Sequence, residues 1–212
     1  MYGVALKVWG PLACFTRPEM KVERVSYDVM TPSAARGILE AIYWKPVIVW
    51  RIDRIHVLKP IRFVSIMRNE VGCKMSHTSP RLFVEDKREQ RHSLMLRDVA
   101  YIIEAHFELT ALAGKDDPHD KEPEKHREIF MRRAQKGQCY HRPYLGTREC
   151  VADFEWIEPP FPPTELPEED RHKDLGWMLY DIDFEHNKES LFFRARLENG
   201  VLHVPPKEEV VR

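Results

Sequence analysis

The sequence lacks a long hydrophobic run. No stretch approaches the roughly 18 apolar residues of a membrane-spanning helix, which excludes a helical membrane protein. The N-terminus also lacks a basic segment followed by a small-residue cleavage site, so we expect a cytoplasmic protein. Cysteines are few and have no framework spacing, which predicts reduced thiols at Cys14, Cys73, Cys139 and Cys150.

The motifs of familiar enzyme classes are missing as well. There is no Walker loop, GxGxxG, GxSxG or HExxH, the signatures of nucleotide-binding proteins, serine hydrolases and zinc proteases. Paired CxxC ends, which are typical of structural zinc sites, are also absent. We therefore expect a protein with no metal and no cofactor.

The composition that remains is that of an ordinary globular protein. Hydrophobic residues make up 43% and charged residues 32% of the 212 residues, which is too apolar-rich for a disordered chain. A chain of this length buries a core of its own without disulfides. The length fits one large domain or a domain with an appended subdomain.

The formal net charge of −1 conceals an uneven distribution. Residues 1–100 carry 17 Lys and Arg against 10 Asp and Glu, and residues 121–150 carry 8 against 4. Residues 151–212 are acidic, with 7 against 15. Two basic segments of this kind suggest a nucleic-acid ligand, although ordinary solvated faces explain them equally well.

Two helices are predicted by their end signals and periodicity. Thr31 is a candidate N-cap before Pro32, and an apolar stripe at helical spacing follows it, formed by Ala35, Ile38, Leu39 and Ile42. Pro46 ends this helix. The second helix is predicted from Pro123 to about Lys136, after a disordered-looking polar loop over 114–121.

The strand pattern around these helices predicts an α+β protein. Strands are expected over Tyr2–Trp9 (ended by Gly10-Pro11), Val47–Val57, Ile61–Met67, Asp98–Leu109 and within Arg142–Trp156. The resulting order is that of a ferredoxin-like, RRM-type βαββαβ domain, predicted over 1–157 with an irregular hairpin excursion at 69–96. A small antiparallel sheet is expected over 158–212, with Asn199-Gly200 as a hairpin turn.

Three side chains stand out as candidates for chemistry. Lys125 and His126 lie in the first turn of the second helix, where free N–H groups favour a phosphate. Tyr43 lies at the end of the first helix, where the simpler interpretation is a half-buried boundary aromatic with its hydroxyl in water. For His126, which precedes the apolar Ile129 and Phe130, the simpler interpretation is a packed core residue.

Four stretches of the sequence carry a family resemblance: 27–46, which ends in YWKP; 53–60, DRIHVLKP; 105–108, AHFE; and 144–150, YLGTREC. They resemble the type I-C (Dvulg-subtype) CRISPR-associated RAMP proteins, Cas family five, d form. The resemblance implies a ferredoxin-like RNA-recognition fold and metal-independent cleavage of CRISPR repeat RNA. It also implies that the protein stays on the crRNA 5′ handle in the interference complex (Cascade), beside the backbone and large subunits.

The resemblance implies a catalytic set of Tyr43, Lys125 and His126. Cations in the matching stretches and on the second helix are predicted to bind RNA, namely Arg36, Lys45, Arg127, Arg132, Arg133, Lys136 and Arg148. In such a reaction the 2′-OH attacks the adjacent phosphorus, and imidazole suits the proton transfers while lysine neutralises charge. Whether His126 or Tyr43 accepts the 2′-OH proton stays open at this point.

Two other functions compete with repeat cleavage. The chain could bind the crRNA 5′ handle as a non-catalytic assembly subunit, with the same three residues holding RNA. It could also bind duplex DNA through its basic face without sequence preference. We further expect the basic excursion at 69–96 to contact the repeat hairpin or a neighbouring subunit, because long structureless loops are usually functional or disordered.

Overall fold

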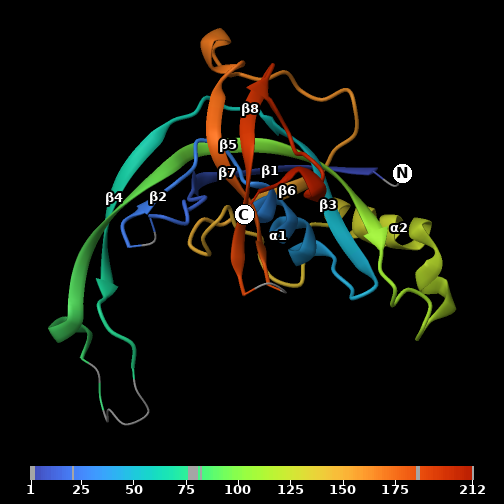
Figure 1. Cartoon of the computed structure of the whole chain (residues 1–212), viewed down its shortest axis with the longest axis horizontal. Coiled ribbons are helices and arrows are strands. Elements are labelled where there is room, and N and C mark those ends of the chain that lie inside the picture. The colour runs from blue at the N-terminus through green and yellow to red at the C-terminus, as the bar shows by residue number, and fades with distance from the viewer. Residues whose placement is uncertain (1–2, 21, 76–80, 82, 185–186, 212) are drawn as a thin grey trace.

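The computed structural model describes residues 3–20, 22–75, 81, 83–184 and 187–211. Two α-helices, nine strands and four short 3₁₀ turns make up the regular structure of this part of the chain (Figure 1). Their bounds are β1 Gly3–Ala13, β2 Arg24–Val25, α1 Pro32–Ile42, β3 Ile48–Val57, β4 Phe63–Val71, β5 Arg88–Leu109, α2 Pro123–Gln135, β6 Asp153–Trp156, β7 Asp174–Asp183, β8 Glu189–Glu198 and β9 Val201–His203.

The strands form one curled sheet in the order β6-β1-β5-β3-β9-β8-β7, and β2 and β4 both pair with β5. Neighbouring strands are antiparallel, except that the two-residue β2 runs parallel to β5. Figure 1 shows the sheet arching over the two helices. The predicted α+β class is therefore confirmed, with a mostly antiparallel sheet covered by helices.

Both predicted helices are confirmed close to their expected bounds. The Thr31 hydroxyl accepts a hydrogen bond from the Ala34 N–H over 3.3 Å, which caps α1 where the sequence places the cap. The helix ends at Ile42, four residues before Pro46. Helix α2 starts at Pro123 and ends at Gln135, one residue before the expected end.

The core joins α2 to the middle of the sheet through Trp50 on β3. Its ring centroid lies 5.4 Å from that of Phe107 on β5 and 4.9 Å from that of Phe130 on α2. Trp50 and Phe130 are buried, and the Trp50 indole N–H donates to the Tyr43 carbonyl over 2.9 Å. The aromatic core therefore also fixes the residue that follows α1.

The prediction that Gly10-Pro11 ends the first strand is wrong. Strand β1 continues to Ala13 and stays paired with β5 through Leu12↔Arg97 and Ala13↔Leu96. Strand β6 pairs with β1 only up to Trp9, so one side of β1 has no strand neighbour beyond that point among the described residues. Proline is tolerated on such an edge because no ladder hydrogen bond is lost there. Tyr2, the expected first residue of the strand, lies outside the described residues.

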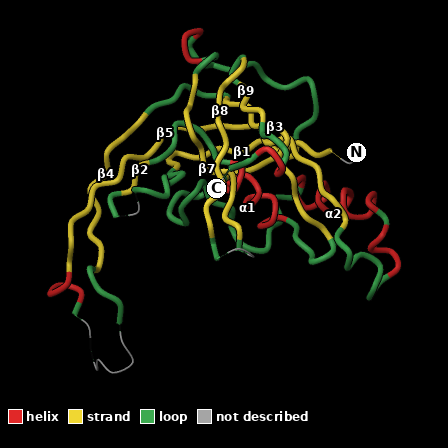
Figure 2. Tube along the Cα trace, in the orientation of Figure 1, coloured by secondary structure: helices red, strands yellow, loops and turns green. Residues whose placement is uncertain are grey.

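The excursion predicted at 69–96 is a long hairpin, as expected, but it is more regular than predicted. Strands β4 and β5 pair without interruption from Phe63↔Leu96 to Val71↔Arg88. Figure 2 shows the two strands running side by side away from the helices. Residues 76–80 and 82 of the excursion lie outside the described part of the chain.

The C-terminal strands are confirmed and continue the same sheet. Asn199 and Gly200 have φ angles of 52° and 77°, as the turn between β8 and β9 requires. Strand β9 pairs with β3 through Ile55↔Leu202. The division into a domain over 1–157 and a subdomain over 158–212 stays a prediction. None of the helices in the described ranges has the length and apolarity needed to cross a membrane.

The loop before β6 is held against β1 by a close approach at Gly146. The Cys14 N–H donates to the Leu145 carbonyl over 2.9 Å, and the Leu145 N–H donates to the Cys150 carbonyl over 2.7 Å. Gly146 has a φ of 88°, and a Cβ atom at this position would collide with the Cys14 carbonyl oxygen. Only glycine fits here.

We therefore expect Gly146→Ala to lower the free energy of unfolding by about 3 kcal/mol or more, since backbone strain and a backbone clash add. The matched control is Gly137→Ala, where φ is 63° but a Cβ would meet nothing within 4 Å. Its expected cost is only about 1 kcal/mol. Urea denaturation midpoints measure both losses, and equal losses would contradict the close approach.

Candidate active site

Tyr43 is positioned by the end of α1. Its backbone N–H donates to the Leu39 carbonyl over 2.9 Å, and its own carbonyl accepts the Trp50 indole N–H. The Arg133 guanidinium lies 5.3 Å from the centre of the tyrosine ring and donates to the Ile42 carbonyl over 2.9 Å. Tyr43 is only 3% exposed, so it projects from the helix end into the interior.

His126 lies in the first turn of α2 and is completely buried. Its ring packs edge-on against Phe107, with centroids 6.0 Å apart. Nε2 lies 3.1 Å from the Asp120 carbonyl oxygen, which only accepts hydrogen bonds, so Nε2 carries the proton. In the neutral tautomer Nδ1 is then the acceptor, and the Tyr43 hydroxyl donates to it over 2.7 Å.

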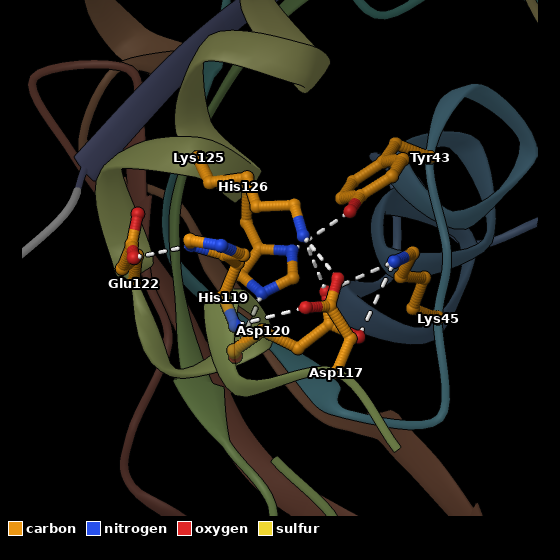
Figure 3. A network of polar contacts seen from close by, with 8 residues as sticks. All are labelled: Tyr43, Lys45, Asp117, His119, Asp120, Glu122, Lys125 and His126. Atoms are coloured by element: carbon orange, nitrogen blue, oxygen red, sulfur yellow. Dashed lines mark hydrogen bonds and ion pairs between the residues drawn. The ribbon is translucent and has the colours of Figure 1, made fainter. Parts of the chain in front are cut away.

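Asp120 gathers the two lysines of the site around its carboxylate (Figure 3). Oδ1 accepts from Lys125 Nζ over 2.9 Å and from Lys45 Nζ over 3.0 Å. Lys125 also donates to Asp117 over 2.8 Å. Asp120 is 7% exposed, whereas the two lysine side chains remain about one-third exposed. The lysines therefore form the solvent-facing side of the cluster.

The electrostatics keep Tyr43, Asp120 and Lys125 each in one protonation state near neutral pH. Burial raises the pKa of the Tyr43 phenol, and the nearby Asp120 adds to the rise, so the phenol stays protonated. Hydrogen bonds from Lys125 and Lys45 lower the pKa of Asp120. Hydrogen bonds to Asp117 and Asp120 raise the pKa of Lys125, which therefore stays cationic.

The three residues expected to form the catalytic set thus meet in one cluster. Tyr43 and His126, which are 83 residues apart in the sequence, are hydrogen-bonded directly, and Lys125 precedes His126 on α2. The interpretation of Tyr43 as a half-buried aromatic with its hydroxyl in water is wrong. Its position at the C-cap of α1 turns the side chain toward α2 rather than toward solvent.

The cations expected to bind RNA have different environments. Lys45 and Arg133 have the partners described above. Arg36 pairs with Asp181 and Glu40. Arg127 donates to the Gly3 carbonyl and lies over the Trp156 ring. The other members are Arg132, Lys136 and Arg148, which lie at or near the surface.

The sequence did not reveal the two aspartates of the cluster. The polar sequence over 114–121 looks disordered, but this loop contains a short 3₁₀ turn at Pro118–Lys121. The Asp117 carboxylate accepts from the His119 N–H over 3.0 Å, which starts this turn. An Asp-Pro pair is a local turn signal that supports this geometry. The burial of Asp120 depends on Lys45, which is distant in sequence, and no local pattern predicts it.

Among the described residues, no group of three or more His, Cys, Asp or Glu side chains is placed to hold a metal ion. The polar cluster consists of one imidazole, one phenol, two ammonium groups and two carboxylates that pair with them. Its chemistry is that of proton transfer and charge neutralisation.

Comparisons with known proteins agree on one family. A family model for Cas5d, described as "CRISPR-associated protein (Cas_Cas5)", matches residues 3–205. The chain is 53% identical over 225 residues to the CRISPR pre-crRNA endoribonuclease Cas5d of Mannheimia succiniciproducens, covering 99% of this chain and 98% of that protein. It is 44% identical over 229 residues to the enzyme of the same name from Thermus thermophilus, covering 98% and 93%.

A solved structure shows the same fold. The crystal structure of a CRISPR-associated protein superimposes with a TM-score of 0.74 at 26% identity, covering 99% of this chain and 96% of that chain. The match includes the C-terminal strands as well as the helix-covered part of the sheet. The chain belongs to the Cas5d family of CRISPR-associated proteins.

Proposed function

We propose that this protein is a pre-crRNA endoribonuclease that cleaves CRISPR repeat RNA without a metal ion. Its relatives at 53% and 44% identity, which the chain matches over nearly their full length, are named pre-crRNA endoribonucleases. The observation that supports the activity in this chain is the 2.7 Å contact between Tyr43 Oη and His126 Nδ1, with Lys125 beside it. The same three residues are those that the family resemblance implies for catalysis.

The proposed reaction is an intramolecular transesterification. The 2′-oxygen of one nucleotide attacks the adjacent phosphorus, the bond to the 5′-oxygen breaks, and the products are a 2′,3′-cyclic phosphate and a 5′-hydroxyl. The enzyme must take a proton from the 2′-OH, return one to the 5′-oxygen and stabilise the charged phosphorane between these steps.

We infer that the proton leaves through Tyr43 rather than directly through His126. Both nitrogens of the buried imidazole are occupied, whereas the Tyr43 oxygen, which donates its proton to His126, keeps lone pairs that can accept from the RNA. Tyr43 Oη accepts the 2′-OH proton while its own proton moves to His126 Nδ1. The resulting imidazolium keeps its Nε2 proton, which stays hydrogen-bonded to the Asp120 carbonyl. The pair then returns one proton to the departing 5′-oxygen, which restores the starting tautomer.

Lys125 is the cation of the proposed reaction. An ammonium group has three donors, and two of those on Lys125 are used by Asp117 and Asp120. The third is available to a phosphate oxygen. The two carboxylates orient the side chain and keep it charged, so Asp120 acts as a positioning residue for Lys125 and, through its carbonyl, for His126.

The wider assignments follow from the same proposal. We propose a ferredoxin-like core, supported by the order β6-β1-β5-β3 with antiparallel neighbours and by the βαββαβ sequence of these elements. We also propose that the protein stays on the crRNA 5′ handle as a Cascade subunit. The projecting β4–β5 hairpin, which exposes Phe63, Met67 and Val71 along one strand, suits contact with RNA or a neighbouring subunit.

A second candidate function is RNA binding without cleavage. The complete burial of His126 and the occupation of both its nitrogens favour this alternative, because a packed, satisfied histidine needs no catalytic role. Incubating purified protein with repeat RNA in EDTA separates the two candidates. Cleavage supports the endoribonuclease, whereas tight binding without products supports the binding subunit.

In the same assay, replacing His126 is expected to abolish cleavage and leave affinity for the repeat RNA within a few-fold. His126→Ala leaves a cavity, so His126→Gln is tested beside it, with thermal unfolding to confirm folding. The matched control is His119→Ala, which removes an exposed histidine from the neighbouring 3₁₀ turn. Unchanged single-turnover cleavage in both His126 variants would remove this residue from the mechanism.

Deleting the Tyr43 hydroxyl is a sharper test of the proton path. Tyr43→Phe is expected to slow single-turnover cleavage by about 100-fold or more, because general acid–base catalysis contributes factors of this size. The matched control is Tyr27→Phe, since the buried Tyr27 hydroxyl accepts only a structural hydrogen bond from the Leu179 N–H at 3.2 Å. Equal rates for the two variants would contradict a relay through Tyr43.

Charge reversal tests which cations follow the RNA backbone. Arg132→Glu combined with Lys136→Glu changes two residues at the end of α2 and leaves Arg133, which contacts Tyr43, in place. The slope of log affinity against log salt should become shallower by about 0.7 for each phosphate that the variant no longer neutralises. Charge reversal of Lys188 and Lys207 in the acidic tail is the control. Competition by duplex DNA tests whether the basic face binds DNA instead of RNA. An unchanged slope would place the α2 cations away from RNA.

A further inference from the structure

An aromatic surface lies between α2 and β6, separate from the buried cluster. Tyr140 is 91% exposed, more than any other large hydrophobic side chain in the described ranges. The His141 ring lies edge-on to it at 6.2 Å, and the His141 and Tyr144 rings are nearly parallel, 23° apart, at 6.1 Å. A group of neighbouring aromatic rings at the surface, unlike a single exposed side chain, is typical of a ligand-binding surface.

The same segment forms a small open pocket. Its volume is about 310 Å³, and it is lined by His141, Arg142, Tyr144 and Arg148. The size lies at the lower end of the range of about 300–1,000 Å³ for small-ligand sites, so it suits one nucleotide rather than a helix. Arg142 pairs with Asp153, whereas Arg148 is exposed and no ion pair of it occurs among the residues that the structure describes. An exposed guanidinium is therefore available beside the stacked rings.

A backbone hydrogen bond ties the start of this segment to the end of α1, close to the site. The Tyr140 N–H donates to the Ala41 carbonyl over 2.8 Å, two residues before Tyr43. The other end is anchored where Leu145 and Gly146 meet the backbone of Cys14. The segment is thus fixed at both ends, and the exposed Tyr140 and His141 rings project from it into solvent.

We propose that this pocket binds one unpaired nucleotide of the repeat RNA next to the cleavage site. The base stacks on the His141 and Tyr144 rings with Tyr140 at its edge, and the phosphate binds Arg148. Every base has a π-face, and guanidinium groups match phosphate oxygens, so the combination of rings and cations favours RNA over a protein partner. A paired base offers no free face, so the ligand is single-stranded. The assignment deepens the proposed function and rests on it.

The test measures binding and not cleavage. The probe is repeat RNA with a 2′-deoxy nucleotide at the cleavage position, which cannot react, so the result does not depend on whether the protein is a nuclease. Tyr144→Leu removes a π-face and should weaken binding by about 5- to 150-fold, the effect of losing one stacked base. Tyr140→Leu removes the contact at the edge of the base and should weaken binding by about 2- to 12-fold. The Tyr→Phe variants at both positions should bind like the wild type. Trp177→Leu, which removes an exposed aromatic on β7, is the matched control.

A second measurement identifies the nucleotide. An abasic residue is placed at each unpaired position in turn, and at one position the loss caused by Tyr140→Leu should disappear because the stacked base is already gone. Tyr140 is exposed, so this variant folds even if Tyr144→Leu does not. Wild-type affinity in Tyr140→Leu, or an equal loss on a stem without unpaired nucleotides, overturns the proposal. Normal RNA binding combined with failed assembly into the complex overturns it in favour of a protein interface.

Discussion

The site depends on a single short turn that carries Asp120. Its carboxylate holds Lys45 and Lys125, and its carbonyl oxygen fixes the proton of His126 on Nε2. Because that tautomer leaves Nδ1 free to accept, the direction of the hydrogen bond from Tyr43 is also set. One residue that contributes no proton of its own thus determines the state of the four side chains around it.

The charges within the cluster balance, which separates its chemistry from its attraction for RNA. Two lysines face two aspartates, so the cluster as a whole attracts phosphate weakly at a distance. Long-range attraction must come from exposed cations elsewhere, such as those at the end of α2. Guidance of the RNA and activation of its 2′-OH are then tasks of different parts of the surface.

The sequence predicted best what is decided locally. Thr31-Pro32 caps α1, and Asn199-Gly200 turns between β8 and β9, since the neighbouring residues alone favour these geometries. The continuation of β1 past Pro11 was missed because it depends on which side of the strand lacks a neighbour. That is a property of the assembled sheet.

The site was predictable only in part for the same reason. Tyr43 and His126 each have an ordinary structural interpretation when considered alone, and the family resemblance was what connected them. The pairing of Asp120 with Lys45 spans 75 residues, and local composition suggested disorder there instead. Polar contacts between distant segments leave no periodic pattern, whereas apolar stripes and end caps do.

The two halves of the site also emerge from the ribosome at different times. The end of α1 is synthesised before α2, and β3, β4 and β5 lie between them in the chain, so all three strands have been made by the time His126 can meet Tyr43. The last strand on that side of the sheet, β6, follows α2 and closes against β1. A nascent or truncated chain that ends before α2 therefore lacks the hydrogen-bonded pair altogether. Vectorial synthesis itself thus delays the appearance of the completed site until most of the sheet is available.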